Sequence, residues 1–167
     1  MQKKISQLYC FINEYKYSLL SNLDKNIHVI YRNYKKNVDI STLILIKKIC
    51  KKNNLKLYIS NNIKLALKYN LDGVYIPSFN KEINYIKYSL PKNFEIIGSA
   101  HNNYEILTKQ KQGCKFIFIS PLFKVQKSSF FLNITKFNLL TNNKKNRFIA
   151  LGGINKKNIK KLSLLNI

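Results

Sequence analysis

Seven short apolar segments recur along this chain of 167 residues, and segments with helical spacing lie between them. The apolar segments span residues 8–12, 27–31, 55–59, 73–76, 94–98, 115–119 and 147–151. Within them, residues 116–119 are apolar at every position, which is typical of a strand buried on both faces of a sheet. Because strands that alternate with helices form parallel βα units, the pattern predicts an α/β fold around a parallel sheet.

Apolar residues at helical spacing predict the helices that connect these strands. They indicate helices over 40–49 and 63–67, and a less regular pattern of the same kind over 82–89, 102–112 and 155–165. Asp39, Ser41 and Thr42 are suitable cap residues in front of the first helix, and Gly113 lies where a helix should end.

Two folds share this pattern, the doubly wound sheet and the (β/α)8 barrel. The chain is short for a barrel, which typically needs about 250 residues. An eighth strand would begin where the sequence ends, so we expect a short TIM-barrel-like fold with seven βα units. No linker or internal repeat separates two regions, which predicts a single domain over residues 1–167.

The charge of the chain is strongly basic, with 30 Lys and Arg against 7 Asp and Glu and a net charge of +23. Such a balance is compatible with nucleic acid, an anionic surface or phosphorylated small molecules. The lysines are spread along the whole chain, however, and only Arg32 and Arg147 are arginines. The abundance of Lys, Asn, Ile and Tyr is also what an AT-rich genome encodes. Nucleic-acid binding is therefore kept only as an alternative function.

Cys10, Cys50 and Cys114 are odd in number, widely separated and without metal-ligand spacing. We expect reduced, mostly buried thiols in a cytoplasmic protein. The apolar run near the N-terminus is too short for a signal peptide. No segment reaches the roughly 20 apolar residues that span a bilayer, so no membrane association is expected.

In either parallel fold, functional residues lie in the loops after the carboxyl ends of the strands. These loops contain hydrogen-bond donors rather than carboxylate pairs or His and Cys clusters, so they suit an anion better than a metal. Arg32 follows the second strand and His101 the fifth. Each also has an alternative without a ligand. Arg32 would then be a solvated surface arginine, and His101 a histidine in a structural hydrogen bond.

Gly152 and Gly153 follow the last strand, and a helical pattern begins directly after them. Two glycines allow a tight turn and a close approach of the backbone to a ligand. The N–H groups that open the next helix would then face an anion. A tight turn without a ligand is the alternative. The glycine pair thus predicts a candidate phosphate site.

Four blocks of the sequence resemble thiamine phosphate synthases and TenI-type proteins, in the same order and at similar spacing. The blocks lie at residues 71–76, 96–102, 119–123 and 149–155, and the resemblance runs from about residue 27 to the end. It implies a (β/α)8 barrel that joins a pyrimidine pyrophosphate to a thiazole phosphate, with Mg²⁺ on the leaving pyrophosphate. TenI-type relatives include a thiazole tautomerase and proteins without a settled activity.

The resemblance implies roles for individual residues. Ser99 and His101 match a Ser-Ala-His block and become the candidate catalytic residues. Candidate substrate- and phosphate-binding residues are Arg32, Lys35, Asn61, Asn62, Ser120, Gly152 and Gly153. Asn61 and Asn80 occupy the two positions where the family has aspartates that bind Mg²⁺.

Two amides in place of two aspartates change the expected chemistry, because Mg²⁺ prefers anionic oxygen ligands. We therefore expect a synthase-like protein with altered or reduced metal-dependent catalysis, using Mg²⁺ only if the synthase activity is retained. A TenI-like barrel, either tautomerase or non-catalytic, is the alternative, so its status as an enzyme stays open. The expected partner is a phosphorylated small molecule, thiazole phosphate or thiamine phosphate, and the resemblance is compatible with a homodimer.

Overall fold

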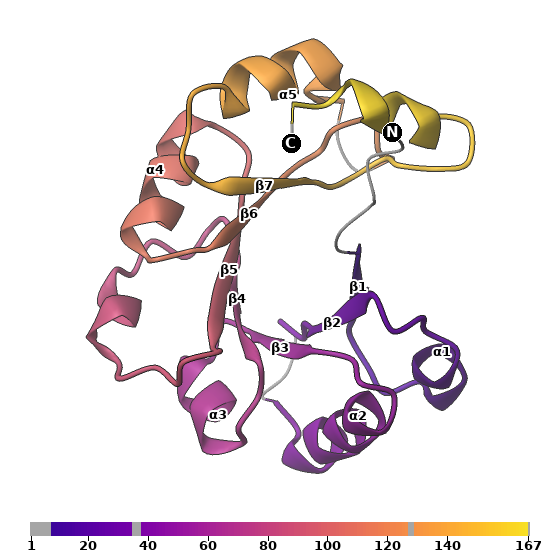
Figure 1. The fold of residues 1–167 in the computed structure, drawn as a ribbon, viewed down its shortest axis with the longest axis vertical. Helices are drawn as coiled ribbons and strands as arrows, with labels where there is room; N and C mark the ends of the chain where they lie inside the picture. The colour runs from indigo at the N-terminus through magenta and orange to yellow at the C-terminus, as the bar shows by residue number, and fades with distance from the viewer. Residues whose placement is uncertain (1–7, 35–37, 127–128, 167) are drawn as a thin grey trace. The chain divides into compact units, whose positions relative to one another are not determined.

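The computed structural model describes residues 8–34, 38–126 and 129–166, and strands alternate with helices throughout (Figure 1). The strands are β1 (Leu8–Ile12), β2 (Ile27–Tyr31), β3 (Leu57–Ser60), β4 (Gly73–Ile76), β5 (Glu95–Ala100), β6 (Phe116–Ile119) and β7 (Arg147–Ala150). The α-helices are α1 (Tyr17–Ser21), α2 (Ile40–Lys52), α3 (Ile63–Lys68), α4 (Asn103–Lys111) and α5 (Asn133–Thr141). Two 3-10 helices, η1 (Asn84–Lys87) and η2 (Ile159–Leu164), follow β4 and β7.

The strand order of the sheet follows the order of the chain from β1 to β7. The pairs β1–β2, β2–β3, β3–β4, β5–β6 and β6–β7 are all parallel. A doubly wound sheet reverses its strand order at a switch point, whereas a (β/α)8 barrel does not. The sequential order therefore selects the barrel type between the two folds that the sequence pattern allows.

The chain divides into two compact units, and the first comprises residues up to 75 together with 90–95. Its core is formed by the strand side chains and by one face of α2, where Leu43, Ile46 and Cys50 are buried at helical spacing. All of β3 is buried, as the apolar pattern predicts. Asp39 caps α2 by accepting hydrogen bonds from the backbone N–H groups and the hydroxyls of Ser41 and Thr42, which confirms the predicted cap.

The Asp39 cap is expected to make stability depend on pH. Hydrogen bonds from Thr42 and Ser41 lower the pKa of Asp39 to about 2, against about 3.9 in an unfolded chain. The folded pKa is the lower one, so the contribution is present above about pH 4 and is lost as pH falls toward 2. Asn is an equally good cap that does not titrate. In thermal melts from about pH 6 to pH 2, Asp39→Asn should therefore lose less melting temperature than the wild type; equal losses would contradict this role.

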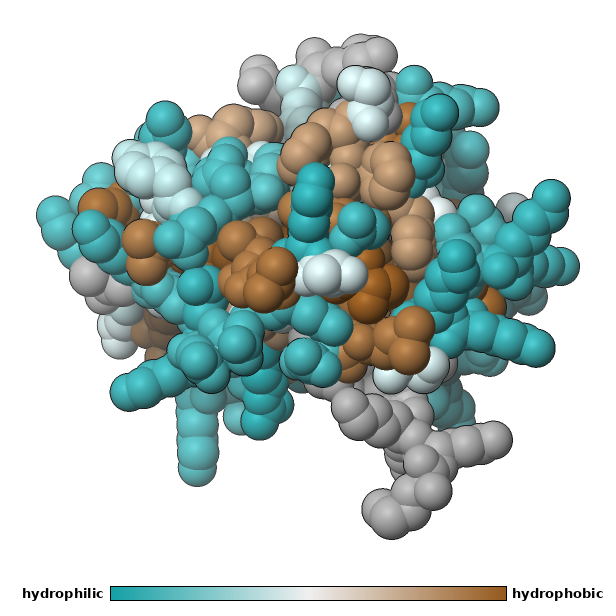
Figure 2. Space-filling view, turned by 90° about the horizontal axis from the view of Figure 1, so that it is seen from above, coloured by the Kyte–Doolittle hydropathy of each residue, from teal (hydrophilic) through white to brown (hydrophobic). Residues whose placement is uncertain are grey.

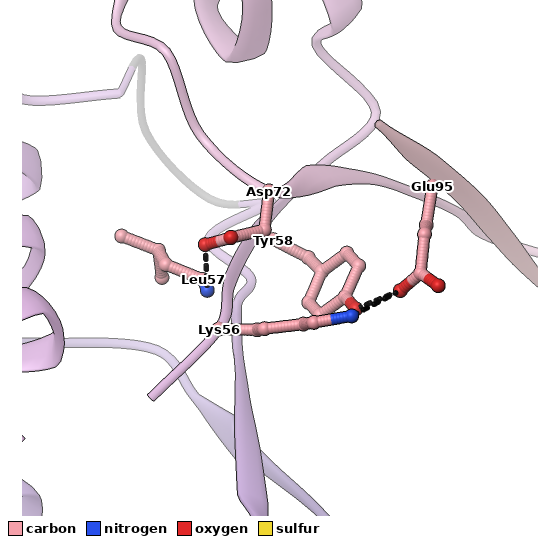
Figure 3. A network of polar contacts seen from close by, with 5 residues as sticks. All are labelled: Lys56, Leu57, Tyr58, Asp72 and Glu95. Carbon is pink, nitrogen blue, oxygen red and sulfur yellow. Dashed lines mark hydrogen bonds and ion pairs between the residues drawn. The ribbon is translucent and has the colours of Figure 1, made fainter. Parts of the chain in front are cut away.

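In the first unit, the buried carboxylate of Glu95 forms polar contacts near the amino end of β3 (Figure 3). Glu95 is 5% exposed and accepts hydrogen bonds from the Tyr58 hydroxyl and from Lys56 Nζ, the latter at 3.2 Å. Burial and the Glu95 carboxylate raise the pKa of Tyr58 well above its ordinary value. Close by, Asp72 accepts the N–H of Leu57 at 2.8 Å. The network ties the start of β5 to β3 within this unit.

The second unit comprises residues 76–89 and 96–167, and it contains most of β5 together with β6, β7, α4 and α5. The strand segments 96–100 and 116–119 are buried throughout. Gly113, just after α4, has a φ of 77°, which confirms that it ends this helix. Figure 2 shows apolar residues interspersed with hydrophilic side chains on the face that it draws.

Three of the predicted helices are present, and two are not. The helices predicted over 40–49, 63–67 and 102–112 correspond to α2, α3 and α4. The predictions over 82–89 and 155–165 are wrong, because only the short 3-10 helices η1 and η2 form there. In the second case Asn155 and Asn158 bond backbone N–H groups with their side chains, which competes with helix formation. The sequence patterns did not identify α1 and α5.

The cysteines agree with the prediction of mostly buried thiols. Cys50 and Cys114 are buried free thiols, and Cys10 is half-buried and free. Burial raises the pKa of Cys50 and of Cys114 to about 12, so both are protonated and unreactive. Within residues 8–34, 38–126 and 129–166, no helix has the length and apolar character needed to cross a membrane.

Candidate functional site

His101 is held in a defined orientation at the carboxyl end of β5. Its Nδ1 lies 2.6 Å from the carbonyl oxygen of Ser120, which can only accept, so Nδ1 carries the proton. The other ring nitrogen, Nε2, lies 3.1 Å from Oγ of Ser78, and in the neutral ring it is the acceptor of that contact. The ring is exposed to solvent. This is the arrangement of a histidine that can exchange a proton through Nε2.

The start of α4 positions the His101 backbone. Asn102 is the N-cap and accepts the N–H of Glu105 at 2.9 Å. The Glu105 carboxylate reaches back and accepts the N–H of His101 at 2.8 Å. This reciprocal pair is a variant of the capping box, which places the glutamate three residues after the cap. The spacing of Asn102 and Glu105 is visible in the sequence, whereas nothing local in the sequence singles out Ser78.

The predicted serines have different places in this arrangement. Ser120 contributes its carbonyl to His101, and its hydroxyl lies 3.4 Å from the same Nδ1. Ser99 is 4% exposed and lies within β5, two residues before His101. The structure therefore brings Ser78 and Ser120 to the histidine ring by contacts, and it buries Ser99 in the strand.

Gly152 and Gly153 form a turn that no other residue fits without strain. Their φ angles are 90° and 72°, in the left-handed region. A Cβ on Gly153 would lie 2.4 Å from the carbonyl oxygen of Phe123, and one on Gly152 would lie 2.9 Å from Cα of Pro121. Within the described residues, none of the backbone N–H groups of Gly152, Gly153 and Ile154 donates a hydrogen bond to the protein. Three successive N–H groups without an acceptor are donors that an anion could use.

The segment after the glycines differs from the prediction that a helix N-terminus would face the anion. The N–H of Asn155 donates to Asn158 Oδ1 at 2.8 Å, and that of Lys157 donates to Asn155 Oδ1 at 2.9 Å. η2 begins only at Ile159. These donors are used inside the turn, so the open N–H groups are those of the glycines themselves.

In the first unit, Arg32 follows β2 and lies between aromatic rings. Its backbone N–H donates to the carbonyl of Ile12 at 2.7 Å. Its guanidinium carbon is 5.0 Å from the ring centre of Phe11 and 5.7 Å from that of Tyr34. The Ser60 hydroxyl donates to the Tyr34 hydroxyl at 3.1 Å, and burial raises the pKa of Tyr34. Stacking restricts the guanidinium, and a side-chain hydrogen bond from Arg32 to Tyr34 holds it further.

The remaining predicted residues of the first unit lie around β3. Asn61 has a φ of 59°, and its N–H donates to the carbonyl of Tyr75 at 2.8 Å. The side chain of Asn62 caps α3 by accepting the N–H of Leu65 at 3.0 Å. Lys35 lies outside the described residues.

Asn80 lies in the second unit, and its side chain is already bonded at both ends. Its Oδ1 accepts the N–H of Glu82 at 2.8 Å, and its Nδ2 donates to the Tyr85 hydroxyl at 2.9 Å. Its backbone carbonyl accepts the ammonium of Lys109 at 2.9 Å. A cation fixed beside Asn80 opposes a second cation there, so this position does not fit Mg²⁺. No group of three or more His, Cys, Asp and Glu that could hold a metal occurs in the described part of the chain.

A surface pocket of about 560 Å³ lies elsewhere in the second unit. It is lined by the C-terminal part of α4 and by residues 143–146, which precede β7. It therefore opens at the amino ends of β6 and β7. His101 and the glycine turn follow the carboxyl ends of β5 and β7, so this pocket is not the candidate site.

The chain is similar to known thiamine-phosphate synthases. A family model for thiamine monophosphate synthase matches residues 25–167. The thiamine-phosphate synthase of Prochlorococcus marinus subsp. pastoris is 30% identical over 161 residues, covering 90% of this chain and 46% of that protein. That of Pelagibacter ubique is 28% identical over 160 residues, covering 92% of this chain and 76% of that protein.

A solved structure agrees with these relatives. The thiamine phosphate pyrophosphorylase from Pyrococcus furiosus matches with a TM-score of 0.71 at 17% identity, covering 95% of this chain and 81% of that one. This likeness shows the TIM-barrel-like α/β fold. The chain spans less than half the length of the Prochlorococcus relatives that it matches. The family match and the fold agree, and the chain belongs to the thiamine monophosphate synthase family.

Proposed function

We propose that this protein binds a phosphorylated thiazole-type ligand and moves a proton on it with His101, without a metal ion. The observation that carries the proposal is the orientation of the His101 ring between the Ser120 carbonyl and the Ser78 hydroxyl. A ring with Nδ1 protonated and Nε2 open can take a proton from a bound ligand and return it at another atom. This is the chemistry of a tautomerase, the TenI-like alternative.

The phosphate of the ligand would bind at the glycine turn of the same unit. Gly152, Gly153 and Ile154 offer three successive N–H groups, which suit the oxygens of a phosphate monoester. The high positive charge of the chain, +23, favours the approach of such an anion.

The donor set around Asn80 supports a reaction that does not depend on Mg²⁺. By the family resemblance, Asn61 and Asn80 stand where the family has metal-binding aspartates, and the Asn80 amide is bonded on both sides. A neutral amide cannot offset the charge of the metal as a carboxylate does. The ionisation of a pyrophosphate would lose its main source of charge stabilisation.

The synthase reaction, which joins a pyrimidine pyrophosphate to a thiazole phosphate, is the second candidate. The names of the matched relatives favour it, since both are thiamine-phosphate synthases. In this case the basic side chains would replace part of the stabilisation that the metal supplies. A cytoplasmic location and a homodimer stay predictions.

The proposed ligand site is tested by binding of thiazole phosphate with and without Mg²⁺. Isothermal titration with thiazole phosphate is expected to give affinities that agree within about twofold in Mg²⁺ and in chelator, because no metal bridges protein and phosphate. Gly153→Asp should weaken binding by about tenfold or more, since the new carboxylate occupies the strained turn and repels the phosphate. Gly113→Asp is the matched control, because Gly113 also has a positive φ but lies at the end of α4.

Two results would contradict the proposal. Unchanged affinity in folded Gly153→Asp would remove the phosphate from the glycine turn. Formation of thiamine phosphate from both precursors, dependent on Mg²⁺, would establish the synthase reaction instead.

A further inference from the structure

Lys109 is a fully buried lysine in a chain whose other lysines are abundant and mostly solvated. It lies in the last turn of α4 with 0% exposure, and burial lowers its pKa to about 8. Its ammonium donates to the carbonyl of Pro77 at 2.7 Å, to the carbonyl of Asn80 at 2.9 Å and to Gln112 Oε1 at 2.9 Å. All three of its protons are used, which is how a buried ammonium is tolerated.

Gln112, which is also 0% exposed, binds the same segment. Its Nε2 donates to the carbonyls of Asn80 and Glu82 at 3.0 and 2.9 Å. The two side chains thus supply four hydrogen bonds to backbone carbonyls within residues 77–82, the segment that follows β4. Ser78 lies in this segment, and its hydroxyl faces Nε2 of His101.

Helix α4 therefore bonds both the His101 backbone and the segment that carries Ser78. The N-terminal end of α4 holds the His101 backbone through Glu105, and its C-terminal end holds the Ser78 segment through Lys109 and Gln112. Gly98 makes room for this arrangement, because a Cβ there would lie 2.8 Å from Cδ of Lys109. The lysine stem fits against β5 only where the strand has no side chain.

We propose that Lys109 and Gln112 are positioning residues that hold segment 77–82 so that the Ser78 hydroxyl meets Nε2 of His101. The inference rests on the proposed function for its effect on rate. Without the ammonium, the carbonyl of Pro77 loses its buried partner and that of Asn80 keeps only Gln112 Nε2, so the segment is held by fewer bonds and shifts. The Ser78 hydroxyl is then no longer held at hydrogen-bond distance from Nε2 of His101.

The test compares Lys109→Met, which keeps the length of the side chain and removes its donors, with Lys111→Met on the exposed part of the same helix. Lys109→Met is expected to lower kcat for thiazole isomerisation by about tenfold with KM changed less than about threefold, because positioning acts on the proton-transfer step. Lys111→Met should match the wild type. In a Ser78→Ala background, Lys109→Met should lower kcat no further, whereas a merely structural role lowers it equally in both backgrounds.

A second readout does not require activity. The long-range nitrogen–proton spectrum of the His101 ring reports the hydrogen bond at Nε2, and Lys109→Met should move the Nε2 resonance toward its position in Ser78→Ala. If Lys109→Met does not fold, Gln112→Met removes two of the four bonds and should move the resonance in the same direction. If the wild type has no isomerase activity, only the proposed function is refuted. The nitrogen–proton spectrum still tests whether Lys109 and Gln112 position Ser78 against His101. An unchanged Nε2 resonance in either folded variant overturns the inference.

Discussion

Replacing His101 with alanine is expected to lower the rate of thiazole isomerisation by a factor of about 10² to 10⁴, the usual contribution of general acid–base catalysis. The Ser120 carbonyl fixes the ring through Nδ1, and only Nε2 is left to exchange a proton. No other histidine replaces it, because His28 lies in the first part of β2, beside Tyr9 and Tyr58. Steady-state rates and ligand titration on the same preparation measure the effect.

The expected loss is in kcat, with ligand affinity held within about twofold, because the proposed phosphate donors are the backbone groups of the glycine turn. His28→Ala is the matched control, since it removes the other imidazole of the chain and should keep the wild-type rate. Ser78→Ala should fall between the two, because it removes the partner of Nε2 and not the base. A rate in His101→Ala equal to that of His28→Ala would exclude His101 as the acid–base group.

Gly73→Ala is expected to destabilise the protein by about 3 kcal/mol, at the upper end of the cost of overpacking. The new methyl would lie 2.0 Å from the carbonyl oxygen of Glu95 and 2.8 Å from Cδ1 of Tyr58. Relief requires a shift of the β5 backbone, and this shift pulls the Glu95 carboxylate away from the Tyr58 hydroxyl and Lys56 (Figure 3). Urea unfolding measures the loss, which corresponds to about 6–12 °C in melting temperature for a chain of this size.

Gly98→Ala is the matched control. Gly98 lies in β5, the strand that follows β4 in the chain. Its methyl would meet the Cys114 sulfur and Cδ of Lys109, both at 2.8 Å, and these are side-chain atoms, whereas a methyl on Gly73 meets a backbone oxygen at 2.0 Å. We expect a loss of about 1 kcal/mol, clearly below that of Gly73→Ala. Equal losses at the two positions would show that the contact with the Glu95 backbone is not decisive.

Strand positions were predictable from local patterns because each strand is a short apolar run between polar segments. The predicted ranges 8–12, 27–31 and 73–76 coincide with β1, β2 and β4, and the other strands differ by one or two residues at their ends. Helices were predictable where an apolar face and a cap occur together, as in α2 with Asp39. The helix predicted over 155–165 is absent, because asparagine side chains there bond the backbone N–H groups instead.

The candidate site was predictable only in part. His101 and the glycine pair follow strands and so belong to the functional end of a parallel fold. Ser78 escaped prediction because its contact with His101 joins the loops after β4 and β5, and no local pattern reports which side chain of a loop turns toward a neighbour. Lys109 escaped for the same reason, since a lysine in a helix of this composition is usually solvated.

The sequence by itself determined the alternation of strands and helices and the family resemblance, and it predicts that Asn61 and Asn80 stand at the family's two metal-binding aspartate positions. These features depend on residue order alone. Only the tertiary structure decided which atom of His101 is open, which N–H groups of the glycine turn lack acceptors, and that a buried ammonium holds the segment of Ser78. The contacts of His101 and of Lys109 are hydrogen bonds between residues far apart in the chain, whose partners exist only once the strands are side by side.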